Sequence, residues 1–145
     1  KSFKIIARTD ARATHGLDEA LARGEAFLKA GADILFIEAP RSEEEMRKVA
    51  ETFKGVPLLA NIVEDGKTPL LSPKELEALG YKIILYPISA LLAVTRRLEE
   101  AYDLLLAGRR TDLDGARSSF GHYNDIMNLP ELLAVTRQLA GANKE

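Results

Sequence analysis

Residues 33–40 of the chain read Asp-Ile-Leu-Phe-Ile-Glu-Ala-Pro (DILFIEAP), a run of apolar side chains that ends in a carboxylate. Four consecutive apolar residues are typical of a parallel strand that is buried on both faces. Three further segments are also apolar runs with a polar residue at the end: FKIIARTD (3–10), PLLANIVE (57–64) and KIILYPIS (82–89). The four runs begin about 25–30 residues apart, which suits successive βαβ units. The sequence therefore predicts an α/β protein with a parallel sheet.

The segments between and after these runs are predicted to be helices, because apolar residues recur in them at helical spacing. Two of the starts, Ser42 to Glu45 and Ser72 to Glu75, have the spacing of a capping box. The predicted helices cover 17–28, 42–53, 73–80, 90–107, 113–127 and 130–139. The last two lie outside the βα repeat and form a helical tail.

Size and composition narrow the class of protein. A chain of 145 residues, 46% hydrophobic and 29% charged, fits one globular domain with a core of its own. With a net charge of −2, the chain lacks the excess of basic residues that is typical of nucleic-acid-binding proteins. No apolar run is long enough to cross a membrane. The chain has no cysteine, which excludes disulfides, thiolate metal sites and a cysteine nucleophile supplied by this chain. We expect a cytoplasmic protein with no nucleic-acid or membrane partner.

Polar side chains stand at the ends of three of the predicted strands, where parallel α/β folds carry their chemistry. Arg8 either binds a carboxylate or phosphate of a ligand or pairs with an internal acid such as Asp10 or Glu38. Glu38 can hold a hard cation directly or through water, act as a base, or simply pair with Arg8. Asn61 needs hydrogen-bond partners, and either a ligand or the backbone can supply them.

Five blocks, taken together and in order, resemble the isocitrate lyase/phosphoenolpyruvate mutase superfamily. They are IARTDA (6–11), ADILFIEAP (32–40), ANIVE (60–64), GKTP (66–69) and LYP (85–87). The residues of these blocks are most similar to those of the methylisocitrate lyase, dimethylmalate lyase and carboxyphosphonoenolpyruvate mutase branches. The resemblance implies a TIM (β/α)₈ barrel that binds Mg²⁺ and cleaves or forms bonds next to a 2-oxo acid through an enolate. The implied substrates are small 2-oxo or 2-hydroxy di- or tricarboxylates.

The resemblance also implies roles for the three strand-end residues. Arg8 would clamp a substrate carboxylate, Asn61 would hydrogen-bond the substrate, and Glu38 would support the metal and substrate region, with an intervening water as one arrangement. The family's aspartate-rich metal segment and its loop with a cysteine acid/base have no counterpart here. We therefore expect neither a direct metal ligand nor a catalytic residue in this chain. It resembles strands 5–8 with their helices (1–110) and a C-terminal helical extension (111–145).

Four parallel strands cannot close an eight-stranded barrel. Two sheet edges would stay unpaired and an apolar inner face would stay exposed to water. Each exposed Val, Ile or Leu side chain on that face would cost about 1.5–3 kcal/mol of folding free energy. We expect the chain to be the C-terminal portion of a longer enzyme and inactive alone. The alternative is a non-catalytic half-barrel that folds and self-assembles without a complete active site. A third interpretation, an open doubly wound binding domain, lacks a glycine-rich turn after the first strand.

The apolar residues of the tail need a surface to bury against. Residues 111–139 either swap onto a neighbouring subunit, as the resemblance implies, or pack on their own domain. Because a swapped tail needs a second copy of the chain to pack on, we expect a homo-oligomer.

Overall fold

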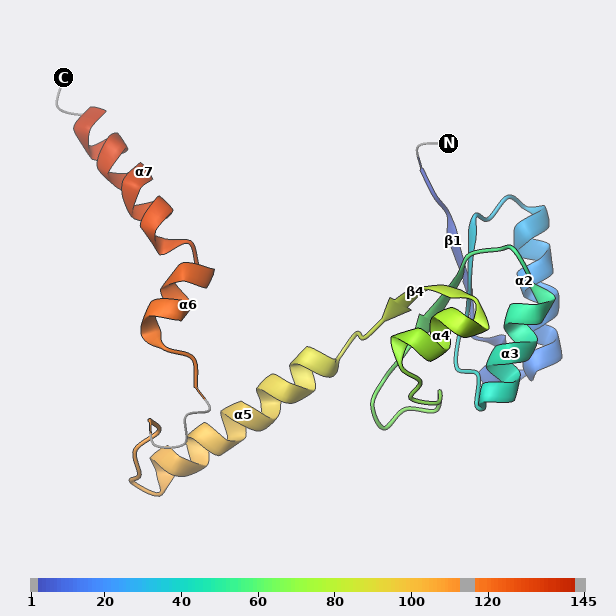
Figure 1. Ribbon diagram of the computed structural model, residues 1–145, viewed down its shortest axis with the longest axis horizontal. Helices are drawn as coiled ribbons and strands as arrows, with labels where there is room; N and C mark the ends of the chain where they lie inside the picture. The colour runs from blue at the N-terminus through green and yellow to red at the C-terminus, as the bar shows by residue number, and fades with distance from the viewer. Residues whose placement is uncertain (1–2, 113–116, 143–145) are drawn as a thin grey trace. The chain divides into compact units, whose positions relative to one another are not determined.

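The computed structural model describes residues 3–112 and 117–142 (Figure 1). Strands and helices alternate along the first part of the chain, and three helices follow the last strand. The elements are β1 (Ile6–Thr9), α1 (Ala11–Thr14), α2 (Leu17–Lys29), β2 (Ile34–Ile37), α3 (Glu43–Thr52), β3 (Leu58–Asn61), α4 (Pro73–Leu79), β4 (Tyr81–Leu85), α5 (Ser89–Leu106), α6 (Phe120–Ile126) and α7 (Leu129–Ala142). The βα repeat predicted from the apolar runs is confirmed.

The strands form one parallel sheet in the order β1-β2-β3-β4. Arg8 lies opposite Phe36 in the β1–β2 register, and Asn61 lies opposite Leu85 in the β3–β4 register. Within the described residues, β1 and β4 each have a strand neighbour on one side only. All four strands therefore present their carboxyl ends at the same edge of the sheet.

The hydrophobic core lies between one face of the sheet and helices α2, α3 and α4 (Figure 1). Leu35 and Ile37 of β2 belong to this core, together with Met46 of α3 and Leu76 of α4. Because successive side chains of a strand point to opposite faces, Phe36 belongs to the other face. Arg8 shares that face because it is the register partner of Phe36.

The helix starts follow the predicted caps, with one difference. At α4 the capping box is complete, since the Ser72 hydroxyl accepts from the Glu75 N–H and the Glu75 carboxylate accepts from the Ser72 N–H. At α3 the Ser42 hydroxyl accepts from the Glu45 N–H, but the Glu45 carboxylate accepts from the N–H of Arg41. Only half of the predicted capping box therefore forms at Ser42.

Two other predictions of local structure need correction. Residues 11–14, which lie outside the predicted strands and helices, form the short helix α1. The helix expected over 113–127 begins only at Phe120, because Ser119 caps it by accepting from the His122 N–H; residues 113–116 lie outside the described residues.

The chain divides into two compact units, Lys1–Arg96 and Arg97–Glu145. This boundary falls inside α5, before the boundary expected at residue 110. None of the described helices is both long and apolar enough to cross a membrane.

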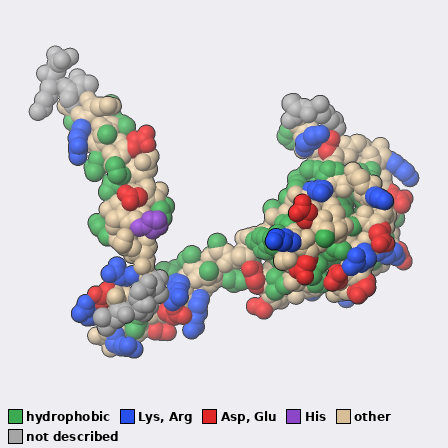
Figure 2. Space-filling view, in the orientation of Figure 1, with side chains coloured by type: hydrophobic (Ala, Val, Ile, Leu, Met, Phe, Trp, Pro, Cys, Tyr) green, Lys and Arg blue, Asp and Glu red, His purple; other side chains and the backbone are tan. Residues whose placement is uncertain are grey.

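Many apolar side chains stay exposed in the described residues. Six large apolar side chains on α5 are more than half exposed: Leu91, Val94, Leu98, Tyr102, Leu105 and Leu106. On the sheet face opposite the helices, Ile6 and Leu85 are also exposed. Figure 2 shows hydrophobic side chains between interspersed acidic and basic groups on the face in view of the sheet-containing unit.

Candidate functional site

Arg8, near the end of β1, makes a two-pronged ion pair with Asp10. Its Nε and Nη2 atoms donate to Oδ2 and Oδ1 of Asp10 at 3.1 and 2.8 Å. Asp10 lies directly after β1, at the N-terminus of α1. The hydrogen bond raises the pKa of the Arg8 guanidinium and lowers the pKa of the Asp10 carboxyl. Both groups are therefore charged at neutral pH.

Glu38, directly after β2, lies between Arg8 and Asn61. Its Oε2 is 3.8 Å from Arg8 Nη2, and its Oε1 accepts a hydrogen bond of 3.4 Å from Asn61 Nδ2. The side chain is 20% exposed, and Oε2 is buried without a hydrogen-bond partner in the described residues. Three residues that the sequence analysis took from separate strands thus meet at one edge of the sheet.

The backbone at the end of β2 has an unusual conformation. The Glu38 N–H donates to the Thr9 carbonyl at 3.0 Å, and the next residue, Ala39, has a φ of 57°. A left-handed conformation is unfavourable for a residue other than glycine and persists only where its surroundings hold it. The chain thus changes direction sharply just after the Glu38 carboxylate.

A hollow of about 260 Å³ lies at this edge of the sheet. Its lining includes Glu38 and Asn61 but not Arg8, which contacts Glu38 from outside the hollow. The lining residues are Asp10, Ala13, Glu38, Ala39, Asn61, Val63, Lys67 and Thr68. Lys67 and Thr68 belong to the GKTP block of the sequence and were not predicted as site residues.

The loop that brings Lys67 to the hollow turns at residues 63–66. Asp65 has a φ of 59°, and the Gly66 N–H donates to the Val63 carbonyl at 3.0 Å. A Cβ on residue 66 would lie 2.8 Å from that carbonyl oxygen. Glycine is therefore required for this turn. In the sequence, the Gly-Lys pair shortly after an apolar run is the feature that could have indicated this turn.

The fit of a divalent cation to this edge is partial. Mg²⁺ is typically held by one or two carboxylates together with waters and substrate oxygens. Asp10 and Glu38 offer oxygen atoms of the right kind, and the buried Glu38 Oε2 has capacity to accept from a water. In the described part of the chain no three His, Asp or Glu side chains gather as a ligand set. These residues could contact a bound ion through water, but they could not supply its full set of ligands.

Two curated relatives are similar to the chain over most of its length. The 2,3-dimethylmalate lyase of Eubacterium barkeri is 45% identical over 139 residues, which are 95% of this chain and 48% of the relative. The 2-methylisocitrate lyase of Bacillus subtilis is 45% identical over 104 residues, 72% of this chain and 34% of the relative. The chain thus spans about a third to a half of the length of these relatives.

Solved structures agree with the sequence relatives. A crystal structure of 2,3-dimethylmalate lyase, described as a PEP mutase/isocitrate lyase superfamily member, has a TM-score of 0.81 at 36% identity; the match covers 94% of this chain and 48% of that one. Phosphonopyruvate hydrolase, in complex with oxalate and Mg²⁺, has a TM-score of 0.75 at 26% identity, over 92% of this chain and 48% of that one.

The sheet is therefore half of a TIM (β/α)₈ barrel, as the resemblance implied. Arg8, Glu38 and Asn61 stand at the carboxyl ends of its strands, where such barrels carry their active sites. The family described as phosphoenolpyruvate phosphomutase matches residues 1–106. The chain belongs to this family, and with it to the isocitrate lyase/phosphoenolpyruvate mutase superfamily.

Proposed function

We propose that this chain supplies half of the substrate pocket of a Mg²⁺-dependent carbon–carbon lyase, or of a related phosphonomutase. The substrates are small 2-oxo or 2-hydroxy di- or tricarboxylates, and the chemistry passes through an enolate. The observation that carries the proposal is the meeting of Arg8, Glu38 and Asn61 at one edge of the sheet, beside a hollow that Glu38 and Asn61 line. The relatives that support it include two carbon–carbon lyases.

In this proposal Arg8 binds a substrate carboxylate. A guanidinium has five N–H donors, and Asp10 takes two of them, so three remain for a ligand. Asn61 gives one amide hydrogen to Glu38 and keeps its second hydrogen and its carbonyl oxygen for the substrate. Mg²⁺, when bound, stabilises the negative charge of the enolate as a Lewis acid. Glu38 orients water and substrate beside it.

We further infer that the complete protein is a homo-oligomer assembled through its helical tail. The support is a set of exposed apolar side chains on α6 and α7, namely Phe120, Tyr123, Ile126, Leu132 and Leu139. Light scattering coupled to size exclusion measures the subunit number, and a stable monomer would contradict the inference. The cytoplasmic location and the tail swap expected from the sequence stay predictions.

Reconstitution of the barrel tests the proposal. The chain is produced alone and together with the part of the Eubacterium barkeri 2,3-dimethylmalate lyase that lies outside the match. We expect Mg²⁺ and oxalate, an enolate mimic, to bind in calorimetry to the assembled enzyme and not to the chain alone. The non-catalytic alternative instead predicts no binding in either preparation.

Arg8→Ala tests the role of the guanidinium in the same assembled enzyme. We expect turnover to fall by about 100-fold or more, because a substrate without its carboxylate anchor is no longer held in a reactive geometry. Near-normal turnover would remove Arg8 from the site.

A further inference from the structure

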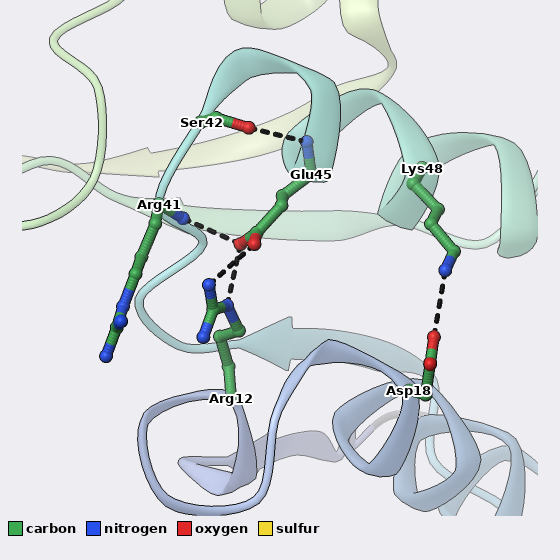
Figure 3. Close-up of polar contacts among 6 residues, drawn as sticks. All are labelled: Arg12, Asp18, Arg41, Ser42, Glu45 and Lys48. Atoms are coloured by element: carbon green, nitrogen blue, oxygen red, sulfur yellow. Dashed lines mark hydrogen bonds and ion pairs between the residues drawn. The ribbon is translucent and has the colours of Figure 1, made fainter.

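A second charged contact lies beside the hollow without lining it. Arg12, on α1, donates from Nε and Nη2 to the two carboxylate oxygens of Glu45 on α3, at 2.7 and 2.6 Å (Figure 3). The two side chains are only 14% and 22% exposed. A two-pronged ion pair with both prongs this short fixes the relative position of the two segments that carry it.

Glu45 is held from three sides. Besides Arg12, its Oε2 accepts from the Arg41 N–H at 2.8 Å, and its own N–H donates to the Ser42 hydroxyl at 3.2 Å (Figure 3). These bonds tie Glu45, through its carboxylate and its backbone N–H, to the stretch of chain that leads from the end of β2 into α3. Arg12 therefore contacts, through Glu45, the segment that follows Glu38.

Together these contacts close a ring around the edge of the sheet. Segments 8–12 and 38–45 are joined at one end by the Arg8–Glu38 pair at 3.8 Å and at the other end by the Arg12–Glu45 pair. The Glu38 N–H bonded to the Thr9 carbonyl is a further link between them. Ala39, with its left-handed backbone, lies inside this ring.

We propose that Arg12 and Glu45 are positioning residues that set the direction of the Glu38 carboxylate toward Arg8 and the hollow. A rotation of the Ala39 backbone swings Glu38, and the unfavourable φ of Ala39 persists only while both ends of the ring are closed. The pair acts through the backbone, because neither of its members lines the hollow. This inference rests on the proposed function for its kinetic consequence.

The expected consequence is specific to turnover. Arg8 keeps its bonds to Asp10 when the Arg12–Glu45 pair is cut, so carboxylate binding persists. Glu38 loses its fixed direction, and a small misplacement of a group beside the reacting atoms can lower the rate strongly.

A matched control is an ion pair between α2 and α3 that lies beyond these two segments. Lys48 of α3 donates to Asp18 of α2 at 2.8 Å (Figure 3), with side chains 54% and 91% exposed. This pair lies outside the ring. Lys48→Met therefore removes an ion pair of similar length but leaves intact the contacts that join segments 8–12 and 38–45.

Steady-state kinetics of the assembled enzyme give the first test. We expect Arg12→Met and Glu45→Gln to lower kcat by about tenfold or more while KM stays within about twofold, and Lys48→Met to change neither. Arg12→Lys restores charge without the two-pronged geometry and should recover only part of kcat. If kcat of the folded Arg12→Met and Glu45→Gln variants stays within twofold of wild type, the inference is wrong.

Crystal structures of the Arg12→Met and Glu45→Gln enzymes give a second test that needs no activity. We expect the Glu38 Oε2 to Arg8 Nη2 distance to exceed 3.8 Å and Ala39 to leave the left-handed region. Unchanged geometry in both variants would overturn the inference. A wild-type assembly without Mg²⁺-dependent activity would instead remove the proposed function, and the crystal structures would still decide the role of the pair.

Discussion

The guanidinium carbon of Arg8 lies 4.7 Å from the centroid of the Phe36 ring. The two residues are register partners on β1 and β2, and Phe36 is only 7% exposed. A cation over an aromatic face gains about 0.5–2 kcal/mol, depending on desolvation. Arg8 is thus contacted by the Phe36 ring as well as by the Asp10 carboxylate.

Replacing Phe36 by leucine removes this aromatic face but keeps an apolar side chain. We expect KM for a carboxylate substrate to rise by about threefold to tenfold, with little change in kcat, because the loss falls on binding. Steady-state kinetics of the assembled enzyme measure it. An unchanged KM would mean that Asp10 alone orients Arg8.

Lys67 is the only basic side chain among the described residues that line the hollow, where Asp10 and Glu38 are acidic. We predict that it binds the second carboxylate of a dicarboxylate substrate. Lys67→Met should then raise KM by about tenfold for longer substrates, whose second carboxylate lies away from the enolate. It should leave the binding of oxalate unchanged, because the two carboxylates of oxalate are directly joined, and Lys67→Arg should retain most of the affinity. Lys74→Met on α4, outside the hollow, is the control. Equal losses of affinity for oxalate and for the longer substrates would contradict the assignment.

Gly24 lies in the middle of α2 against the buried ring of Phe53, and a Cβ there would meet Phe53 Cζ at 2.6 Å. In an exposed helix, glycine to alanine stabilises by about 1 kcal/mol. Here we expect Gly24→Ala to destabilise by about 1–3 kcal/mol in urea unfolding, because the ring has to move. The loss should be smaller in a Phe53→Leu background. A stabilised Gly24→Ala protein would show that Phe53 yields freely.

The Arg12–Glu45 pair should make stability depend on pH. The hydrogen bond from Arg12 lowers the pKa of the folded Glu45 carboxyl below its value of about 4.3 in an unfolded chain. The contribution of the pair is therefore present above about pH 4 and is lost as the pH falls through the lower folded value. We expect wild type to be more stable than Glu45→Gln at pH 7 and the difference to shrink by pH 2–3. If the difference in stability between wild type and Glu45→Gln did not depend on pH, it would not arise from the ionisation of Glu45.

The sequence was sufficient to predict the parallel sheet and the three strand-end residues. Unbroken apolar runs leave few alternatives to buried strands, and a polar residue that ends such a run has to lie at the sheet edge. The mutual contacts of Arg8, Glu38 and Asn61 then follow from the strand order. Their roles toward a substrate remain predictions.

Side-chain contacts away from the strand ends could not be predicted from the sequence. The spacing from Ser42 to Glu45 indicates a capping box, but Glu45 bonds to Arg12, which lies 33 residues earlier in the chain, and to the Arg41 N–H. Local spacing does not reveal such a competing partner. The placement of Lys67 likewise depends on a turn whose conformation appears only in three dimensions.

The contact between Gly66 and the Val63 carbonyl bears on laboratory evolution of the substrate range. Since a Cβ at position 66 would lie 2.8 Å from that oxygen, a mutant library that randomised this position would consist mostly of proteins with a displaced loop. Diversity placed at residues 67 and 68 alters the charge and shape of the hollow and leaves the turn intact. A screen for new specificities is best focused on this pair, with the preceding glycine held constant.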